Sequence, residues 1–198
     1  MATVLFGTSA GTPGISPPRS STWSRQCSQF GRNLADTVDV SSAVSKGDAS
    51  SVSGIQSTAG YQFIYGPLAA QTLSGTVTTV IRGRSTTYVN IYTASTCVWV
   101  ATAAGGVRGT ARAETPYGAL WGTSYVNYTS SALALSSVTV QAGDFLVLEA
   151  GWDSATYTDF DRGNISIGGN VGKWTFSANI ELLVGGLPNA LMLMGAGT

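Results

Sequence analysis

Short alternations of apolar and polar residues dominate the chain from Thr72 to Trp152. The stretches 137–140 and 145–152 place β-branched, aromatic or leucine side chains at close to every second position, with Ala142-Gly143-Asp144 between them. A period of two suits a strand that buries one face, and Gly beside Asp tolerates the positive φ angles of tight turns. The pattern therefore predicts two strands joined by a tight turn.

The same pattern continues on both sides of these two strands and predicts about eight or nine strands. Glycine-rich turns at 104–106, 142–144 and 168–170 separate them at fairly even spacing, and no amphipathic helix interrupts the series. Such a series indicates an all-β, antiparallel β-sandwich. The long connection from Glu114 to Ser131 favours the jelly-roll type over an up-and-down barrel. The predicted strands cover 61–65, 72–82, 88–93, 97–103, 107–113, 133–140, 145–152, 165–167 and 174–184.

Composition divides the chain into three segments. We expect an extended, mostly irregular N-terminal arm over 1–60, the β-sandwich over 61–184 and an apolar C-terminal tail over 185–198. The arm is rich in Gly, Ser and Pro, and prolines such as Pro17 and Pro18 block helix interiors and sheet centres. The apolar tail needs a cover, either its own core or a neighbouring subunit. The residues expected to anchor the two extensions on a partner are Trp23, Phe30, Leu187, Leu191, Met192, Leu193 and Met194.

The charge content indicates a chain that sits against neighbours. Charged residues make up 10% of the sequence, and ten basic residues cancel ten acidic ones. Because soluble domains carry about 25% charged residues, little repulsion opposes association here, and we expect a homo-oligomer. Nucleic acid is not an expected partner, since acidic residues directly follow the basic cluster Arg19, Arg25 and Arg32. A membrane is not expected either, because no apolar run reaches about 18 residues and no signal peptide is visible.

The motifs for enzymatic chemistry are weak. Gly7-Thr8-Ser9-Ala10-Gly11 matches the pattern of a nucleophile elbow, but the chain has no histidine to accept the serine proton. Glu149 is expected on the same strand face as Val147. A lone inward carboxylate of this kind is more often hydrogen-bonded to a turn, or paired with an arginine such as Arg82 or Arg108, than catalytic. We therefore expect no enzyme.

The candidate metal ligands do not fit a known site. Acidic residues gather in the loop 153–164, but their spacing departs from that of an EF-hand and Arg162 lies among them. Cys27 and Cys97 lack the spacing of a metal site, and their pairing as a disulfide stays open. We expect no metal and no cofactor.

Aromatic residues in the connection 114–128 support an alternative function. Many sugar-binding β-sandwiches stack aromatic faces on sugar rings. A long loop more often buries its aromatic residues on the sheet that it crosses or at a subunit contact. The candidate glycan-binding residues are Tyr117, Trp121, Tyr125 and Tyr128.

Three motifs carry a resemblance to a known group: Leu73-Ser-Gly-Thr-Val-Thr, Val107-Arg-Gly-Thr-Ala and Ala142-Gly-Asp-Phe-Leu-Val-Leu-Glu-Ala-Gly. The core that contains them, from Thr72 to Gly168, resembles jelly-roll virion structural proteins of tailed bacteriophages, of the capsid decoration, head-fibre and tail-associated types. The resemblance implies a non-enzymatic protein that binds other virion proteins, such as capsid subunits, through its arm and tail. It also implies synthesis in the host cytoplasm and localisation in the virion. The alternative is a carbohydrate- or receptor-binding β-sandwich module of a phage fibre or secreted enzyme.

Overall fold

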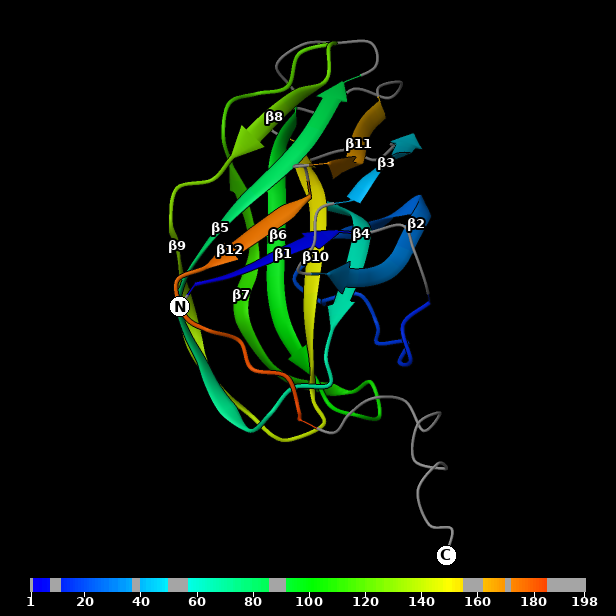
Figure 1. Ribbon diagram of the computed structural model, residues 1–198. Coiled ribbons are helices and arrows are strands. Elements are labelled where there is room, and N and C mark those ends of the chain that lie inside the picture. The colour runs from blue at the N-terminus through cyan, green and yellow to red at the C-terminus, as the bar shows by residue number, and fades with distance from the viewer. Residues whose placement is uncertain are drawn as a thin grey trace, which may run out of the picture.

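The computed structural model describes residues 2–7, 12–36, 40–49, 57–85, 92–154, 162–169 and 172–184. These residues form twelve strands and no helix, as Figure 1 shows, and so contain no helix able to cross a membrane. In chain order the strands are β1 (Thr3–Gly7), β2 (Arg25–Asp36), β3 (Val40–Ala49), β4 (Ser57–Tyr65), β5 (Gln71–Ser85), β6 (Tyr92–Ala101), β7 (Val107–Tyr117), β8 (Val126–Thr129), β9 (Leu133–Val140), β10 (Phe145–Ser154), β11 (Arg162–Gly169) and β12 (Lys173–Phe176).

The first sheet is built around β5, a strand of 15 residues that pairs along both edges. Strands β9 and β8 follow one another along one edge, and β12 and β11 along the other. Strand β1 adds to β12, and β3 adds to β11. All of these pairs are antiparallel, so the length of β5 holds the layer together.

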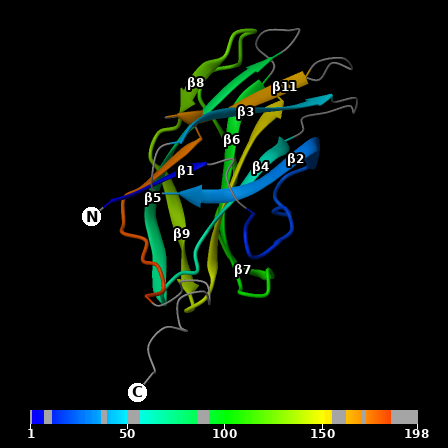
Figure 2. The same ribbon diagram turned by 45° about the vertical axis from the view of Figure 1, so that its right-hand side comes forward.

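The second sheet has the strand order β2-β4-β10-β6-β7. Its pairs are antiparallel except for β2 with β4, which run parallel. Strand β2 also pairs with β1 at Ala35 and Asp36, so it connects the two sheets. Figures 1 and 2 show β1 and β12 of the first sheet crossing β10 and β6 of the second. The prediction of an all-β protein with antiparallel sheets is therefore confirmed.

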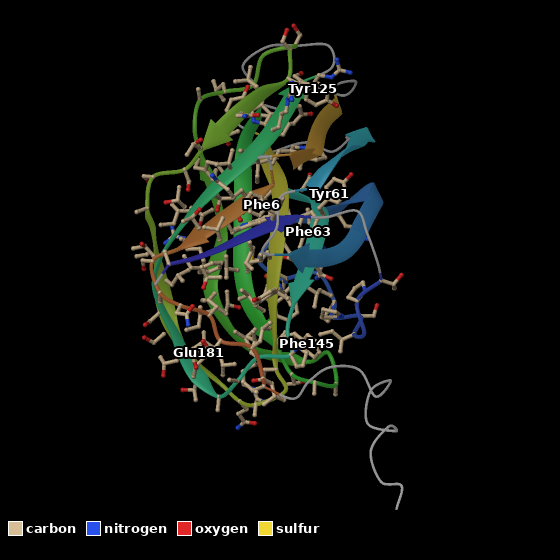
Figure 3. All side chains as sticks on the ribbon, viewed as in Figure 1. Phe6, Tyr61, Phe63, Tyr125, Phe145 and Glu181 are labelled. Atoms are coloured by element: carbon tan, nitrogen blue, oxygen red, sulfur yellow. The ribbon has the colours of Figure 1, made fainter. Side chains whose placement is uncertain are left out.

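The core lies between the two sheets and is rich in aromatic residues. Phe63 of β4 and Trp174 of β12 come from opposite sheets, with ring centroids 5.3 Å apart. The ring centroid of Trp152 of β10 lies 6.0 Å from that of Trp121, which belongs to the connection between β7 and β8. Offset and edge contacts of this kind each add about 0.5–1.5 kcal/mol to the effect of burial. Figure 3 shows Phe63 in the middle of the molecule, where the two layers cross.

The two strands and the tight turn predicted from the pattern of alternation are confirmed, but the strands do not pair with each other: β9 pairs with β5 in the first sheet, and β10 pairs with β4 and β6 in the second. Strand β9 has the predicted bounds, and β10 begins at Phe145 as predicted. Gly143 in the turn has φ +91°, the left-handed region that glycine adopts without strain. The strand predicted over 174–184 is confirmed only for Lys173–Phe176, because the following residues run beside 67–71 with a single bridge between Leu68 and Leu182.

The prediction of a mostly irregular arm over 1–60 is wrong. Strands β1, β2 and β3 and the start of β4 lie in this range. Strand β1 alternates between buried and half-buried residues, but its partners, β12 and β2, lie elsewhere in the sequence. Local composition therefore did not reveal it. Only the stretch from Thr12 to Ser24 is without a strand among the described residues of this range.

Candidate functional site

Glu149 lies in the middle of β10, on the face of the second sheet that points away from the core. Its neighbours on the adjacent strands are Gln62 of β4 and Cys97 of β6. Val147, two residues earlier, packs on the same face, as the sequence predicted. Residues 12–24 cover this face, and the Glu149 side chain is completely buried.

Three N–H groups converge on the Glu149 carboxylate. The Gln62 side-chain amide donates to Oε1 at 2.9 Å, and the backbone N–H of Ser20 donates to the same oxygen at 3.0 Å. The Trp23 indole N–H donates to Oε2 at 2.7 Å. Of the two alternatives that the sequence left open, bonding to a nearby turn is therefore the one found. Neutral N–H donors satisfy the carboxylate without burying a second charge.

The predicted arginine partner of Glu149 is not found. Arg108 instead donates to both oxygens of Asp144, at 2.8 and 2.9 Å. Arg82 lies in the first sheet, on β5. The Glu149 carboxylate thus holds residues 18–23 against the sheet, and Gln62 assists by donating a second hydrogen bond to the Pro18 carbonyl at 2.8 Å.

The Trp23 side chain packs against β10 beside the Glu149 carboxylate. Its ring approaches β10 closely at Gly151, where a Cβ would be only 2.8 Å from two ring carbons and 2.0 Å from the carbonyl oxygen of Thr58. Glycine at this position, beside a register shift between β10 and β4, is thus required for the indole to approach the strand.

Burial shifts the pKa values of the Glu149 carboxyl group and of the Cys97 thiol on the neighbouring strand. It raises the pKa of Glu149, and the hydrogen bonds from Gln62, Ser20 and Trp23 only partly offset that effect. The Trp99 indole also lowers the pKa of Glu149, although its N–H makes no hydrogen bond of normal geometry. Burial, with a contribution from the Glu149 charge, raises the pKa of the Cys97 thiol to about 12. Neither group is accessible to a substrate, and the thiol is not a nucleophile at neutral pH.

A second carboxylate on the same face, that of Glu114 on β7, was not found by sequence reasoning. Glu114 Oε1 accepts a hydrogen bond from the Ser95 hydroxyl, and its backbone N–H donates to Thr22 Oγ1 at 3.0 Å. Burial raises the pKa of Glu114, the Ser95 hydrogen bond opposes this, and the charge of Asp153 adds to it. The pairing of β6 with β7 places Glu114 here, and no local motif indicates that pairing. In the described ranges, no three Asp, Glu, Cys or His side chains gather as metal ligands.

Three of the four candidate glycan-binding aromatic residues belong to the core. Tyr117, Trp121 and Tyr128 are buried, and Trp121 stacks on Tyr128 with ring centroids 5.7 Å apart. Strand β8 pairs Tyr128 with the buried Ile81 of β5 and so turns it inward. The prediction that these three stack on sugars is therefore wrong, because a buried ring has no free face.

Tyr125 is the fourth candidate and remains partly exposed. It lies at the end of the molecule opposite Phe145 and Glu181, as Figure 3 shows. The guanidinium carbons of Arg82 and Arg84 lie 5.7 and 4.6 Å from the centre of its ring. Each such cation–π contact contributes about 0.5–1 kcal/mol at an exposed site. We call these three residues the Tyr125 cluster.

The predicted interface anchors have different outcomes. Trp23 is only 2% exposed and contacts the core of its own chain, so it has no surface left for a partner. Phe30 lies on β2, where the structure describes the backbone and not this side chain. The predicted C-terminal anchors lie outside the described residues: Leu187, Leu191, Met192, Leu193 and Met194.

Exposed apolar side chains directly precede that tail. Leu182, Leu183 and Val184 are 45%, 38% and 99% exposed. Their backbone is held in place, since Leu183 N–H donates to the Pro67 carbonyl at 3.0 Å and Ala69 N–H donates to the Glu181 carbonyl at 2.9 Å. We call Leu182–Val184 the apolar segment.

Comparison with known protein families and with curated proteins gives no match. Two solved structures of a CocE/NonD family hydrolase from Staphylococcus aureus are similar in fold, both at 11% sequence identity, with TM-scores of 0.51 and 0.52. The matches cover 76% and 92% of this chain but only 34% and 36% of the hydrolase chain. The chain thus spans about a third of the hydrolase, and the likeness concerns the fold alone.

Proposed function

We propose that this protein is a non-enzymatic structural component of a virion, of the capsid decoration or capsid-associated type. In this proposal its two sheets form a jelly roll, and it binds other virion proteins and further copies of itself. The observation that carries the proposal is the apolar segment, which exposes three large side chains from a fixed backbone.

The non-enzymatic part of the proposal is supported by the burial of the reactive groups. Glu149 and Cys97 have no exposed surface, and Glu149 already accepts hydrogen bonds from three donors of its own chain. Asp144 is paired with Arg108. These side chains hold the fold together and are not arranged around a space that a substrate could enter.

The assembly part is supported by the apolar segment and by its continuation in the sequence. Burial of one exposed leucine or valine against a partner contributes about 1.5–3 kcal/mol. The sequence after Val184 adds Leu187, Leu191 and Met192 to the apolar side chains available. The near absence of net charge leaves little long-range repulsion to oppose such contacts.

The proposal is tested by the double variant Leu183→Ser, Val184→Ser and by removal of residues 186–198. Light scattering after size-exclusion chromatography should show an oligomer for the wild type and a shift to the mass of the monomer for both variants, which is 20.3 kDa for the full-length chain and less for the shortened one, with unchanged circular dichroism. The matched control is Val107→Ser, which removes an apolar side chain that is 60% exposed on β7. A monomeric wild type that also binds no capsid subunit would contradict the proposal, and so would unfolding of the shortened chain.

A second candidate function is a carbohydrate- or receptor-binding module of a phage fibre or secreted enzyme. Two observations favour it: the fold is similar to a part of a longer hydrolase chain, and the Tyr125 cluster places two arginines beside a partly exposed ring. A glycan array separates this candidate from the assembly role. Glycan binding by the monomeric apolar-segment variant would support it, and an array without any signal would count against it.

A further inference from the structure

We propose that the Tyr125 cluster is a binding subsite for an oxyanion, and that the oxyanion is a carboxylate or sulfate group of an acidic saccharide. This inference names the ligand class of the second candidate function and rests on it. It does not depend on the assembly role.

Arg82 and Arg84 form a pair of positive charges that no carboxylate of the described ranges compensates. Arg82 and Arg84 are two residues apart on β5, so both point to the same, outward face, and their Cα atoms are about 7 Å apart. Strand β8 pairs Asn127 with Arg82, and β11 pairs Ser166 with Arg82 and Asn164 with Arg84. No cross-strand neighbour is a carboxylate, and no carboxylate of the described ranges forms an ion pair with either arginine. Two like charges arranged in this way attract an anion.

Both guanidinium groups lie over the ring of Tyr125. The Tyr125 ring fixes both groups, at 5.7 and 4.6 Å from its centre, so less side-chain freedom is lost when they bind a ligand. The Nε–H of Arg84 is buried and has no hydrogen-bond partner. A guanidinium binds planar oxyanions through two parallel N–H groups. Because the Arg84 Nε–H is not exposed, a carboxylate or sulfate would be bound by the outer N–H groups of the two guanidinium groups.

Polar side chains surround the Tyr125 cluster, and their hydroxyl and amide groups suit a sugar ligand. Thr123, Ser124, Asn127 and Thr129 are exposed in and beside β8, and Val126 between them is 49% exposed. Val126 lies on the opposite strand face from Asn127, so the surface beside the arginines consists of hydroxyl and amide groups, which match the hydroxyl groups of a saccharide. A nucleic acid, with a phosphate at every step, is bound through many more cations than two. The observations thus favour an acidic saccharide.

The test compares matched acidic and neutral sugars by isothermal titration calorimetry. The probes are sialyllactose against lactose, a galacturonate trimer, a sulfated disaccharide, and sulfate ion alone. We expect at least one acidic sugar to bind about tenfold more tightly than its neutral counterpart and than sulfate alone. Arg84→Gln should reduce that affinity about tenfold, and Arg84→Lys, which keeps the charge but loses the planar donor pair, should not restore it. The control Arg112→Gln changes an arginine of β7 that binds Thr115 and should leave the affinity unchanged.

Several results would overturn the inference. They are equal binding of acidic and neutral sugars, equal binding of sulfate alone, full affinity in a folded Arg84→Gln variant, and no binding of any acidic probe at about 10 mM. None of these results concerns the oligomeric state. Loss of sugar binding in a protein that still assembles would thus reject the subsite and leave the assembly proposal intact.

Discussion

At the scale of single residues, the carboxylate of Glu149 joins residues 18–23 to the second sheet. It is buried without a cation, and its oxygens accept only N–H hydrogen bonds, from Ser20, Trp23 and Gln62. An acceptor that joins a strand-free segment to a sheet explains why residues 12–24 have a fixed path. The apolar contacts of Trp23 with Cys97, Trp99 and Val147 add to this attachment.

Replacement of this acceptor tests the attachment. In Glu149→Gln, one carboxylate oxygen becomes an NH2 group that faces N–H donors, so at least one buried donor loses its partner. We expect a loss of about 1–3 kcal/mol in the free energy of unfolding, measured by urea denaturation and followed by tryptophan fluorescence. Glu181→Gln, at an exposed position, is the control and should be neutral. Equal midpoints for the two variants would show that Glu149 does not hold the segment.

The turn glycine Gly143 permits a second test at this scale. A Cβ at this position meets no atom within 4 Å, but φ is +91°. Gly143→Val should therefore cost about 1–3 kcal/mol through backbone strain alone. Gly122 also has open space for a Cβ and no positive φ, so Gly122→Val is the matched control and should have a much smaller effect on the melting temperature. A similar melting temperature for both variants would contradict the strain argument.

At the scale of elements, the turn between β9 and β10 is held by Asp144. Its carboxylate accepts two hydrogen bonds from Arg108 of β7 and one from the backbone of Gln141, at 2.8 Å. The turn is also joined to the chain before β5, where Leu68 N–H donates to the Asp144 carbonyl at 2.7 Å. One aspartate thus connects β7, the β9–β10 turn and the segment before β5.

This arrangement predicts an acid-sensitive step in stability. Burial alone would raise the pKa of Asp144, but the hydrogen bonds from Arg108 and Gln141 and the Arg108 charge together lower it. A lowered pKa in the folded state adds stability above the unfolded value of about 3.9, and this stability is lost as the pH falls through the folded pKa. Urea midpoints should therefore fall more steeply below about pH 4 for the wild type than for Asp144→Asn. Parallel curves would show that the ion pair contributes no acid sensitivity.

At the scale of the whole molecule, the two ends of the described chain have different roles. Residues 2–24 contain β1, which pairs with β12 and β2, and the cover over Glu149, Cys97 and Trp99. The apolar segment, by contrast, exposes its side chains and is held mainly by backbone hydrogen bonds to the chain before β5.

The comparison of two shortened chains tests this difference. Removal of residues 1–24 should abolish the cooperative thermal transition, because it removes β1 from its pairing with β12 and β2, uncovers Cys97 and Trp99, and leaves the Glu149 carboxylate without two of its donors. Removal of 186–198 should leave the transition in place. Circular dichroism melting curves decide between these outcomes. A cooperative transition in the chain without residues 1–24 would show that the N-terminal segment is a detachable arm after all.

The sequence by itself determined those elements that local residue patterns define, whichever strand they pair with. Period-two alternation and the Ala142-Gly143-Asp144 turn were sufficient for β9, β10 and the positive φ of Gly143. The all-β class followed from the same local signals repeated along the chain. The position of Glu149 on the same strand face as Val147 was also predictable, since side chains alternate along any strand, but this face points away from the core between the sheets and is covered by residues 12–24. Local rules apply here because the alternation of side chains along a strand and the positive φ of a turn glycine do not depend on which strand lies opposite.

Only the tertiary structure decided which distant segments meet. Strand β1 is stable through β12 and β2, and the stretch 12–24 has a defined path because it meets Glu149, so neither could be found from glycine and proline content. The same holds for the aromatic residues of the connection 114–128. Trp121 and Tyr128 are buried because β8 pairs with β5, whereas Tyr125 stays at the surface beside two arginines of that strand. A side chain's exposure depends on which strand lies opposite, and that choice is made by packing across the whole fold.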